Sequence, residues 1–276
     1  MGIPTDAYKS RLISSSIRRN LLISGVVFLG AFALALFPEA FDRPLTRLIN
    51  SVAFRSSLFD RFVAAADTYY TFSGVALMAM IWFCWFDNRD PDSRVRILVR
   101  TLAALGAGVI SRFLQYTLPT HPRPYYDPAL DFHRPLSLDP PSFNTWDSFP
   151  SDHVAVFAGL AVVLYLARPW FTFYAIAWTI VVESCRIYMG GHYPSDVIAG
   201  AALAAFVIWG AQASWLISKG DILMRWEKTS PALFYMIAFF LSYQIATLFG
   251  DIRGPFRSSV HISAAQMAVP RPPFRI

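Results

Sequence analysis

The chain has 276 residues, of which 55% are hydrophobic and 15% are charged, and its mean hydropathy is +0.42. A soluble domain of this length carries roughly a quarter charged residues, so the composition indicates a membrane protein and excludes an ordinary soluble fold. The net charge of +6 comes from Lys and Arg at the ends of apolar runs, where lipid headgroups explain them. We therefore expect no nucleic-acid partner.

Seven apolar runs approach the length of about 20 residues that a bilayer-spanning helix needs. They predict an all-α integral membrane bundle with six to seven transmembrane helices, six if the last run does not span. Basic residues before the first run place residues 1–20 in the cytoplasm, and the absence of a cleavage signal after it predicts an uncleaved anchor. The membrane-embedded domain is expected over residues 21–250, and residues 251–276 are expected to form a flexible tail. The runs are Leu21–Phe37, Tyr70–Phe86, Ile97–Leu118, His153–Leu166, Trp170–Met189, Val197–Ile217 and Ala232–Phe249.

Two external stretches lie between these runs. Apolar residues recur at near-helical spacing in Phe41–Ala66, which predicts an amphipathic helix in the membrane interface. The stretch Asp127–Trp146 contains four prolines and predicts an ordered or semi-ordered loop. The two cysteines, Cys84 and Cys185, lie in apolar segments without the spacing of a metal site or a disulfide framework, so we expect them to serve in packing.

Three polar segments fall on the same, external side of the membrane under this topology. His121–Pro124 follows the third run, Phe149–His153 opens the fourth, and Ser184–Asp196 closes the fifth and opens the sixth. The assignment of the spans did not depend on these segments. Their convergence therefore predicts a single site.

The residue types in these segments suit phosphate chemistry. Arg123 and Arg186 carry planar guanidinium groups that match phosphate oxygens. Ser151 stands at the N-cap of a predicted helix, whose first amides would point at an anion. His192 lies four residues before Asp196, and a carboxylate there can hold one ring nitrogen while the other attacks phosphorus.

A second histidine completes the set. His153, at the start of the neighbouring helix, can protonate the leaving oxygen. Two histidines and two arginines, without a cluster of carboxylates, predict phosphoryl transfer that needs no metal and no other cofactor.

The three segments resemble the type 2 phosphatidic acid phosphatase superfamily, which also includes the vanadium-dependent haloperoxidases. Its pattern is Lys-x6-Arg-Pro, then Pro-Ser-Gly-His, then Ser-Arg-x5-His-x3-Asp. The corresponding blocks here are Tyr116-x6-Arg123-Pro124, Pro150-Ser151-Asp152-His153 and Cys185-Arg186-x5-His192-x3-Asp196.

The resemblance implies a role for each matching residue. His192 would be the nucleophile, Asp196 its orienting partner, and His153 the general acid that later activates water. The phosphoryl oxygens would be bound by Arg123, Ser151 and Arg186, together with the backbone amide of Asp152.

Three positions depart from the family pattern. Tyr116 replaces the Lys, and either Arg112, one helical turn earlier, or His121 could supply the missing positive charge. Asp152 replaces the Gly, and its carboxylate would repel phosphate unless it is turned away, paired or protonated. Cys185 replaces the Ser, which we expect to be a mild change.

Several other polar residues are expected to be structural. Glu183 lies three residues before Arg186 on one helix and is expected to be its structural partner rather than a catalyst. A lone histidine at a helix end is usually exposed or hydrogen-bonded without a chemical role, and this is our expectation for His121, His133 and His261.

The resemblance implies a membrane phosphatase that hydrolyses a lipid phosphate or pyrophosphate through a phosphohistidine. Some lipid-pyrophosphate phosphatases of the superfamily have the Pro-Ser-Asp-His form, which favours a prenyl pyrophosphate of the undecaprenyl type, cleaved at the external face of a bacterial inner membrane. The alternatives are a phosphatase for phosphatidic acid, phosphatidylglycerophosphate or a lipid A phosphate, a lipid phosphotransferase, a phosphatase for a soluble sugar phosphate, and a non-catalytic lipid-binding or transport protein. A haloperoxidase is disfavoured because those relatives are typically soluble, and the sequence predicts no oligomeric state.

Overall fold

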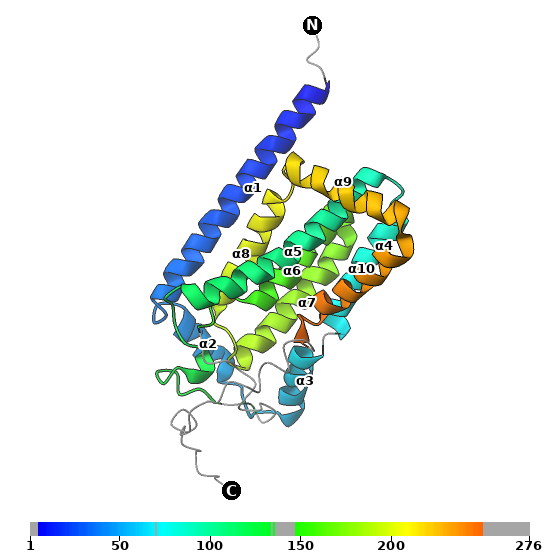
Figure 1. The fold of residues 1–276 in the computed structure, drawn as a ribbon. Helices are drawn as coiled ribbons and strands as arrows, with labels where there is room; N and C mark the ends of the chain where they lie inside the picture. Colours follow the sequence, from blue (N-terminus) through cyan, green and yellow to red (C-terminus); the bar gives the residue numbers. More distant parts are fainter. Residues whose placement is uncertain (1–4, 70, 134, 136–146, 251–276) are drawn as a thin grey trace.

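The computed structural model of the protein describes residues 5–69, 71–133, 135 and 147–250 (Figure 1). Every regular element among them is a helix, which confirms the predicted all-α class. The elements in chain order are α1 (Thr5–Leu36), α2 (Asp42–Asn50), α3 (Ser57–Thr68), the π-helical turn η1 (Thr71–Val75), α4 (Ala76–Asp87), α5 (Pro91–Thr117), the 3-10 turn η2 (Pro124–Tyr126), α6 (Asp152–Ala167), α7 (Pro169–Tyr188), α8 (Pro194–Gly210), α9 (Ser214–Thr229) and α10 (Pro231–Ala246).

Helix α6 is the centre of the bundle and packs against α4, α5, α7 and α8 (Figure 1). Its sequence is apolar on all sides, as expected for a helix surrounded by others, and Phe157, Leu160 and Leu164 are fully buried. Small residues bring α5 close to α6, since a Cβ atom at Gly159 would lie 2.8 Å from the Cβ atom of Ala104. Close packing of this kind is typical of helices in membranes.

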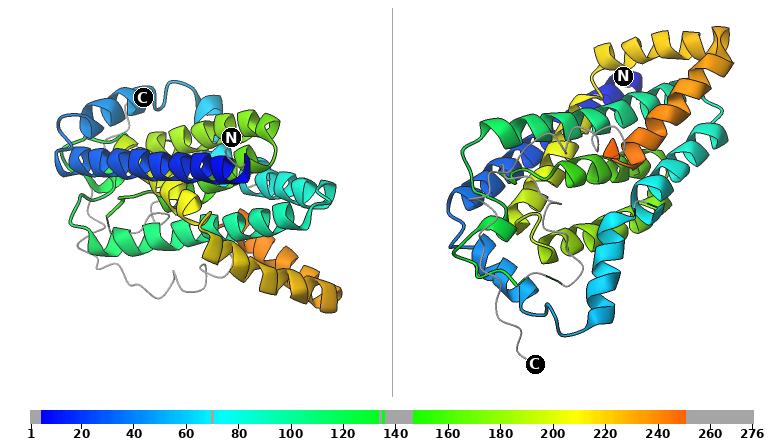
Figure 2. Two further views of the ribbon diagram at one scale, coloured as in Figure 1. Left: turned by 90° about the horizontal axis from the view of Figure 1, so that it is seen from above. Right: turned by 60° about the horizontal axis from the view of Figure 1, so that its bottom comes forward.

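One end of the bundle gathers the polar segments. Helices α5 and α7 end there, α6 and α8 begin there, and α2 and α3 lie beside it, whereas α1 begins at the opposite end (Figure 1). The backbone amide of Ser151, just before α6, donates to the carbonyl of Asp196 in α8 at 3.0 Å. On the outside of the bundle, α1 packs along α8 (Figure 2).

The number of transmembrane helices is not confirmed by length and composition. Among the described residues, Ser15–Leu36 and Pro91–Thr117 are long and apolar enough to span a bilayer, and α8 with α9 would add a third span if that bent pair is counted as one. The apolar helices Ser73–Asp87, Asp152–Ala167 and Pro231–Ala246 are shorter than the roughly 20 residues that a full span takes.

The sixth apolar run is not one continuous helix. Its predicted range, Val197–Ile217, is interrupted because α8 ends at Gly210, and α9 starts at Ser214 with a bend of 78° between the two axes. Helix α9 consequently crosses the end of the bundle opposite the polar segments (Figure 1).

The predicted amphipathic helix over Phe41–Ala66 is two helices, α2 and α3. Helix α2 turns its polar residues inward: Asp42, Thr46 and Asn50 are buried, whereas Leu48 is 67% exposed. An apolar outer face fits the predicted position in the interface, while the inner polar face contributes to the site described below. The predicted loop Asp127–Trp146 is described only in part, and the predicted tail over residues 251–276 lies outside the described residues.

Candidate active site

The seven residues selected from the sequence lie together at the polar end of the bundle. They come from the segment after α5, the start of α6, the end of α7 and the start of α8, and all are buried. Several contacts join these segments. Arg123 donates to the carbonyl of Gly191 at 2.6 Å, the backbone amide of Ser151 donates to the carbonyl of Asp196, and the His192 ring lies 3.1 Å from the carbonyl of Ser148. The seven residues are Arg123, Ser151, Asp152, His153, Arg186, His192 and Asp196.

Ser151 caps α6, as its position before the apolar run predicts. Its side-chain oxygen accepts from the amide of Val154 at 3.4 Å, which satisfies one of the free amides at the start of the helix. The remaining amides of the first turn can serve an anion.

His192 presents one ring nitrogen for chemistry. Its Nδ1 atom lies 3.4 Å from Oδ2 of Asp196 and 3.1 Å from the carbonyl oxygen of Ser148, so the hydrogen-bond network assigns the ring proton to Nδ1. Its Nε2 atom has no hydrogen-bond partner among the described residues. Asp196 is itself held by the amide of Tyr193, which donates to Oδ2 at 2.7 Å.

The environment of His192 keeps this nitrogen unprotonated at neutral pH. Burial lowers the pKa of the ring to about 4, and the cations Arg123 and Arg186 act in the same direction, against the opposing effect of Asp196. A neutral imidazole with a free lone pair is the form in which a histidine acts as a nucleophile.

The second histidine is also paired with a carboxylate. The Nδ1 atom of His153 lies 3.1 Å from Oδ1 of Asp152. The other oxygen of Asp152 accepts from Arg112 of α5, so the carboxylate that replaces the family Gly is paired. Arg112, considered as a replacement for the missing Lys, therefore contacts Asp152 instead, and Tyr116 at the Lys position is 60% exposed.

The two arginines predicted to bind phosphate differ in their partners. Arg186 donates to Asp67 of α3 at 2.9 Å. Arg123 is 4% exposed, donates through Nη1 to the Gly191 carbonyl, and has an Nε atom without a partner among the described residues. Burial lowers the pKa of Arg123 to about 10 against the opposing attraction of Asp152, and the neighbouring cations Arg186 and Arg112 act in the same direction as burial.

Glu183, expected to be a structural partner of Arg186, makes no hydrogen bond with it in the described part of the chain. Glu183 is 1% exposed, and neither of its carboxylate oxygens makes a hydrogen bond within the described part of the chain. Spacing along one helix favoured the pair, but the bundle brings the Asp67 carboxylate of α3 to Arg186 instead.

Sequence reasoning missed the burial of His121 and the position of Asp42. His121 is 6% exposed, and its Nε2 atom lies 3.8 Å from both Oδ2 of Asp42 and Oδ1 of Asp196. Asp42 accepts hydrogen bonds from the amide and hydroxyl of Ser195 at 2.9 and 2.6 Å. His121 stands two residues before Arg123, which was the available signal, whereas nothing local distinguished Asp42.

Three of the site residues could hold a metal ion. Asp152, His153 and His192 each offer a ligand atom, and these atoms lie within 4.8 Å of one another. One carboxylate and two imidazoles form an acceptable ligand set for zinc, but both carboxylate oxygens of Asp152 and the Nδ1 atom of His153 already have partners. These residues fit a tight metal site less well than they fit two separate histidine–carboxylate pairs.

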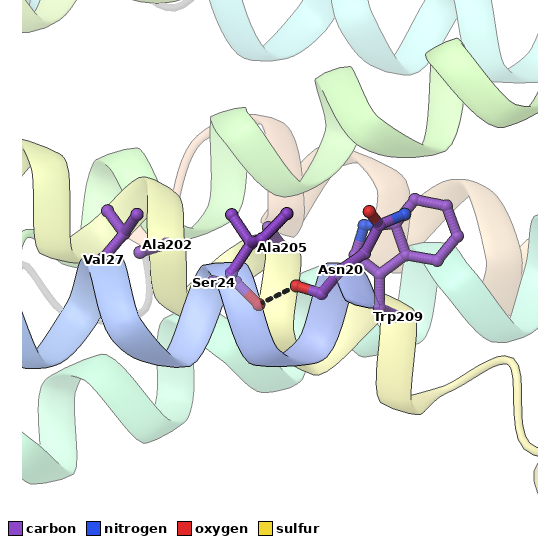
Figure 3. A pocket seen from close by; sticks show the side chains of 7 residues that line it. Asn20, Ser24, Val27, Ala202, Ala205 and Trp209 are labelled. Atoms are coloured by element: carbon purple, nitrogen blue, oxygen red, sulfur yellow. Dashed lines mark hydrogen bonds between the residues drawn. The ribbon is translucent and has the colours of Figure 1, made fainter. Parts of the chain in front are cut away.

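A groove of about 400 Å³ begins beside the site, where Val154 follows His153 and Val197 follows Asp196. It extends along α6 and α7 toward the other end of the bundle. A smaller cavity of about 230 Å³ lies between α1 and α8, near Asn20, Ser24 and Trp209, and none of the seven site residues lines it (Figure 3). The groove is lined by Val154, Ala158, Ala161, Val162 and Tyr165 of α6, Thr172, Ile176, Thr179, Ile180 and Glu183 of α7, and Val197 and Ala201 of α8.

A free imidazole beside buried guanidinium groups and the start of a helix is an arrangement that can bind an oxyanion and attack it. Comparison with known proteins agrees with this class. Residues 97–218 match the PAP2 superfamily, so the chain contains a domain of this superfamily, and the resemblance noted in the sequence is confirmed.

Similar proteins bear lipid phosphatase names. The chain is 36% identical over 63 residues to a lipid A 4'-phosphatase of Bacteroides thetaiotaomicron, an alignment that covers 22% of this chain and 28% of that protein. It is 29% identical over 121 residues to an undecaprenyl-diphosphatase of Sulfolobus acidocaldarius, which covers 44% of this chain and 54% of the relative. The chain thus spans between a quarter and about half of the length of these two relatives. A crystal structure of a PAP2-type phosphatidylglycerolphosphate phosphatase from Bacillus subtilis has a TM-score of 0.43 at 19% identity, covering 72% of this chain and 95% of that one.

Proposed function

We propose that the protein is a membrane phosphatase that hydrolyses a lipid pyrophosphate or phosphate through a phosphohistidine at His192, without a metal ion. The observation that carries the proposal is the free Nε2 atom of His192, which is buried beside Arg123, Arg186 and His153. The PAP2 domain and the names of the similar proteins support the same class of reaction.

The reaction has two steps. The lone pair on Nε2 of His192 forms a bond to phosphorus, the bond to the leaving oxygen breaks, and that oxygen takes a proton from His153. His153 then accepts a proton from water, the water oxygen attacks phosphorus, and the N–P bond breaks to return the electron pair to His192. Asp196 stabilises the charge that develops on the ring, and Arg123 and Arg186 hold the phosphoryl oxygens.

The groove supports a lipid as the substrate. It starts beside His153 and Asp196 and is lined mainly by apolar side chains. A hydrocarbon chain can lie there while its phosphate occupies the site, on the external face of a bacterial inner membrane. The leading candidate is a prenyl diphosphate of the undecaprenyl type, and the similarity to a lipid A 4'-phosphatase favours a lipid A phosphate as the second candidate.

The first experiment measures phosphate release by the purified protein in detergent with EDTA present. Polyprenyl diphosphate, lipid A and phosphatidic acid are compared for the wild type and for His192→Ala. Brief exposure to a radiolabelled substrate should leave a protein-bound label that is stable in alkali, labile in acid and absent from the variant. A folded protein that releases no phosphate from any of these lipids contradicts the proposal and leaves phosphoryl transfer to a second lipid, or lipid binding, as the function.

The groove has its own test. Ala158→Phe and Ala161→Phe fill it and should raise KM for a long-chain lipid phosphate, while KM for a short-chain analogue stays within about threefold of wild type. Ala33→Phe, at an exposed position of α1, is the matched control. An equal effect on both chain lengths would contradict the placement of the lipid chain.

A further inference from the structure

The carboxylate of Asp152 links two elements at the site. One oxygen lies 3.1 Å from Nδ1 of His153, and the other accepts from the guanidinium of Arg112 in α5. Asp152 and His153 are both buried at the start of α6. The histidine therefore contacts the carboxylate through one ring nitrogen, which leaves Nε2 for the reacting atoms.

Helix α5 holds this segment by more than one contact. Arg112 also donates to the side-chain oxygen of Gln115 at 3.0 Å. The side-chain amide of Gln115 and the hydroxyl of Ser111 in turn donate to the carbonyl oxygen of Pro150, at 2.6 and 3.0 Å. One face of α5 thus fixes both the backbone before α6 and the carboxylate in its first turn.

The pairing of the Asp152 carboxylate bears on its role. An unpaired carboxylate beside an anion site would repel phosphate, but Arg112 compensates this charge. Arg112 donates to Asp152 and to Gln115, so the contacts seen for this cation are with protein groups. The other oxygen of the carboxylate contacts His153.

We infer that Asp152 is a positioning residue for the general acid His153, and that Arg112 fixes Asp152 in that orientation. The inference rests on the proposed function for the chemistry of His153. Asp152 accepts the Nδ1 proton and stabilises the imidazolium, so Nε2 carries the proton that passes to the leaving oxygen. After that transfer Nε2 has a lone pair, which accepts the proton of the attacking water. The site then contains two histidine–carboxylate pairs, His192 with Asp196 and His153 with Asp152.

The kinetic test separates substrates by their leaving groups. An alkoxide leaving group needs a proton, whereas p-nitrophenolate does not. Asp152→Asn should lower kcat/KM for a lipid monophosphate by about 10- to 100-fold, within the range that general acids contribute, and kcat/KM for p-nitrophenyl phosphate by less than about threefold. In a His153→Ala background the same substitution should have no further effect. Equal losses with both substrates would overturn the inference, because they would indicate a role in phosphate binding or in the fold.

The role of Arg112 is tested by two substitutions at this position and by one substitution of another buried arginine in α5. Arg112→Lys should retain more activity toward the lipid monophosphate than Arg112→Gln, since it can still pair with Asp152. Arg100→Gln is the matched control, because Arg100 is also a buried arginine of α5 but donates to Gln212, away from the site. If Arg112→Gln does not fold, the neutral double variant Arg112→Gln/Asp152→Asn replaces it, and it should behave like Asp152→Asn alone.

A spectroscopic readout does not depend on activity. Nitrogen NMR of histidine-labelled protein should show His153 as the Nδ1–H tautomer when neutral, and Asp152→Asn should change this signal while leaving that of His192 in place. If the wild type released no phosphate but the tautomer still depended on Asp152, the proposed function would fail and the positioning role would stand. A His153 signal that is unchanged in Asp152→Asn would refute the positioning role.

Discussion

The contact between α6 and α8 at Gly200 controls the geometry of the whole site. A Cβ atom at Gly200 would lie 2.5 Å from the carbonyl oxygen of Ser151 and 3.0 Å from Cβ of Val154. Cβ atoms essentially never approach another atom within 3.0 Å, so Gly200→Ala must move Ser151 away from α8 by about 0.5 Å or more. Ser151 directly precedes Asp152 and His153, and both move with it relative to His192.

The expected cost follows from this displacement. Misplacement of reacting groups by about 1 Å can lower a rate by about 100-fold, so we expect a loss of about 10- to 100-fold in kcat/KM for the lipid substrate. Overpacking should also destabilise the protein by about 1–3 kcal/mol. Phosphate release and thermal unfolding in detergent measure the two effects.

The matched control is Gly106→Ala in α5, where a Cβ atom would meet nothing within 4 Å. This variant should keep full activity and gain up to about 1 kcal/mol from helix propensity. Gly200→Ala with wild-type kcat/KM and wild-type thermal stability would refute the argument that this contact fixes the distance between the two histidines.

Three further predictions follow from the site. EDTA should leave the rate of phosphate release unchanged; a rate that falls with EDTA and returns with zinc would assign a metal to Asp152, His153 and His192. The pKa of His192 is about 4 in the folded protein and about 6.5 in the unfolded chain. As the pH falls from 6.5 toward 4, the histidine therefore binds a proton in the unfolded chain before it does so in the folded protein. This difference should cost the folded state about 2–3 kcal/mol at pH 4.5, so the unfolding temperature of His192→Asn should fall less on acidification than that of the wild type, and an equal fall would contradict the assignment. Asp42→Asn weakens the charge-assisted bonds from Ser195 and should lower stability by about 1–3 kcal/mol, measured by thermal unfolding; no change would mean that this pairing contributes nothing.

Local sequence signals predicted the parts of the fold and site that depend on neighbours in the chain. Ser151 is the N-cap of α6 because the serine, the preceding proline and the following apolar run lie within a few residues. The pairing of His192 with Asp196 spans four residues across one turn into α8. The alternation of apolar runs predicted that the three motif segments meet at one end of the bundle.

Contacts between distant segments could not be predicted in this way. The Arg112–Asp152 pair joins residues 40 positions apart, and the bond between Asp42 and Ser195 joins residues 153 positions apart. Spacing along the helix favoured Glu183 as the partner of Arg186, but Arg186 pairs with Asp67 because α3 packs beside the end of α7. The break after Gly210 was missed because both flanking segments are apolar enough to continue one run.

The buried charge of Arg123 predicts that a bound anion stabilises the folded protein. Among the described residues, Arg112 pairs with Asp152 and Arg186 with Asp67, but the only hydrogen-bond acceptor of Arg123 is the Gly191 carbonyl. Asp152 and Asp196 attract this cation without contacting it. Burial of a cation without a carboxylate in direct contact is costly, and a bound phosphate would place a negative charge against it.

Orthophosphate or vanadate at 100 times its Kd should therefore stabilise the wild type by about 2.7 kcal/mol. Arg123→Gln should abolish this stabilisation and leave the unfolding temperature of the ligand-free protein no lower than that of the wild type, because the substitution also removes the cost of burying the cation. A ligand-free variant that unfolds well below the wild type would mean that the hydrogen bond to Gly191 stabilises the protein more than the buried charge destabilises it. A variant that keeps the phosphate-induced shift in unfolding temperature would show that the anion binds elsewhere, because the predicted stabilisation depends on contact between the anion and Arg123.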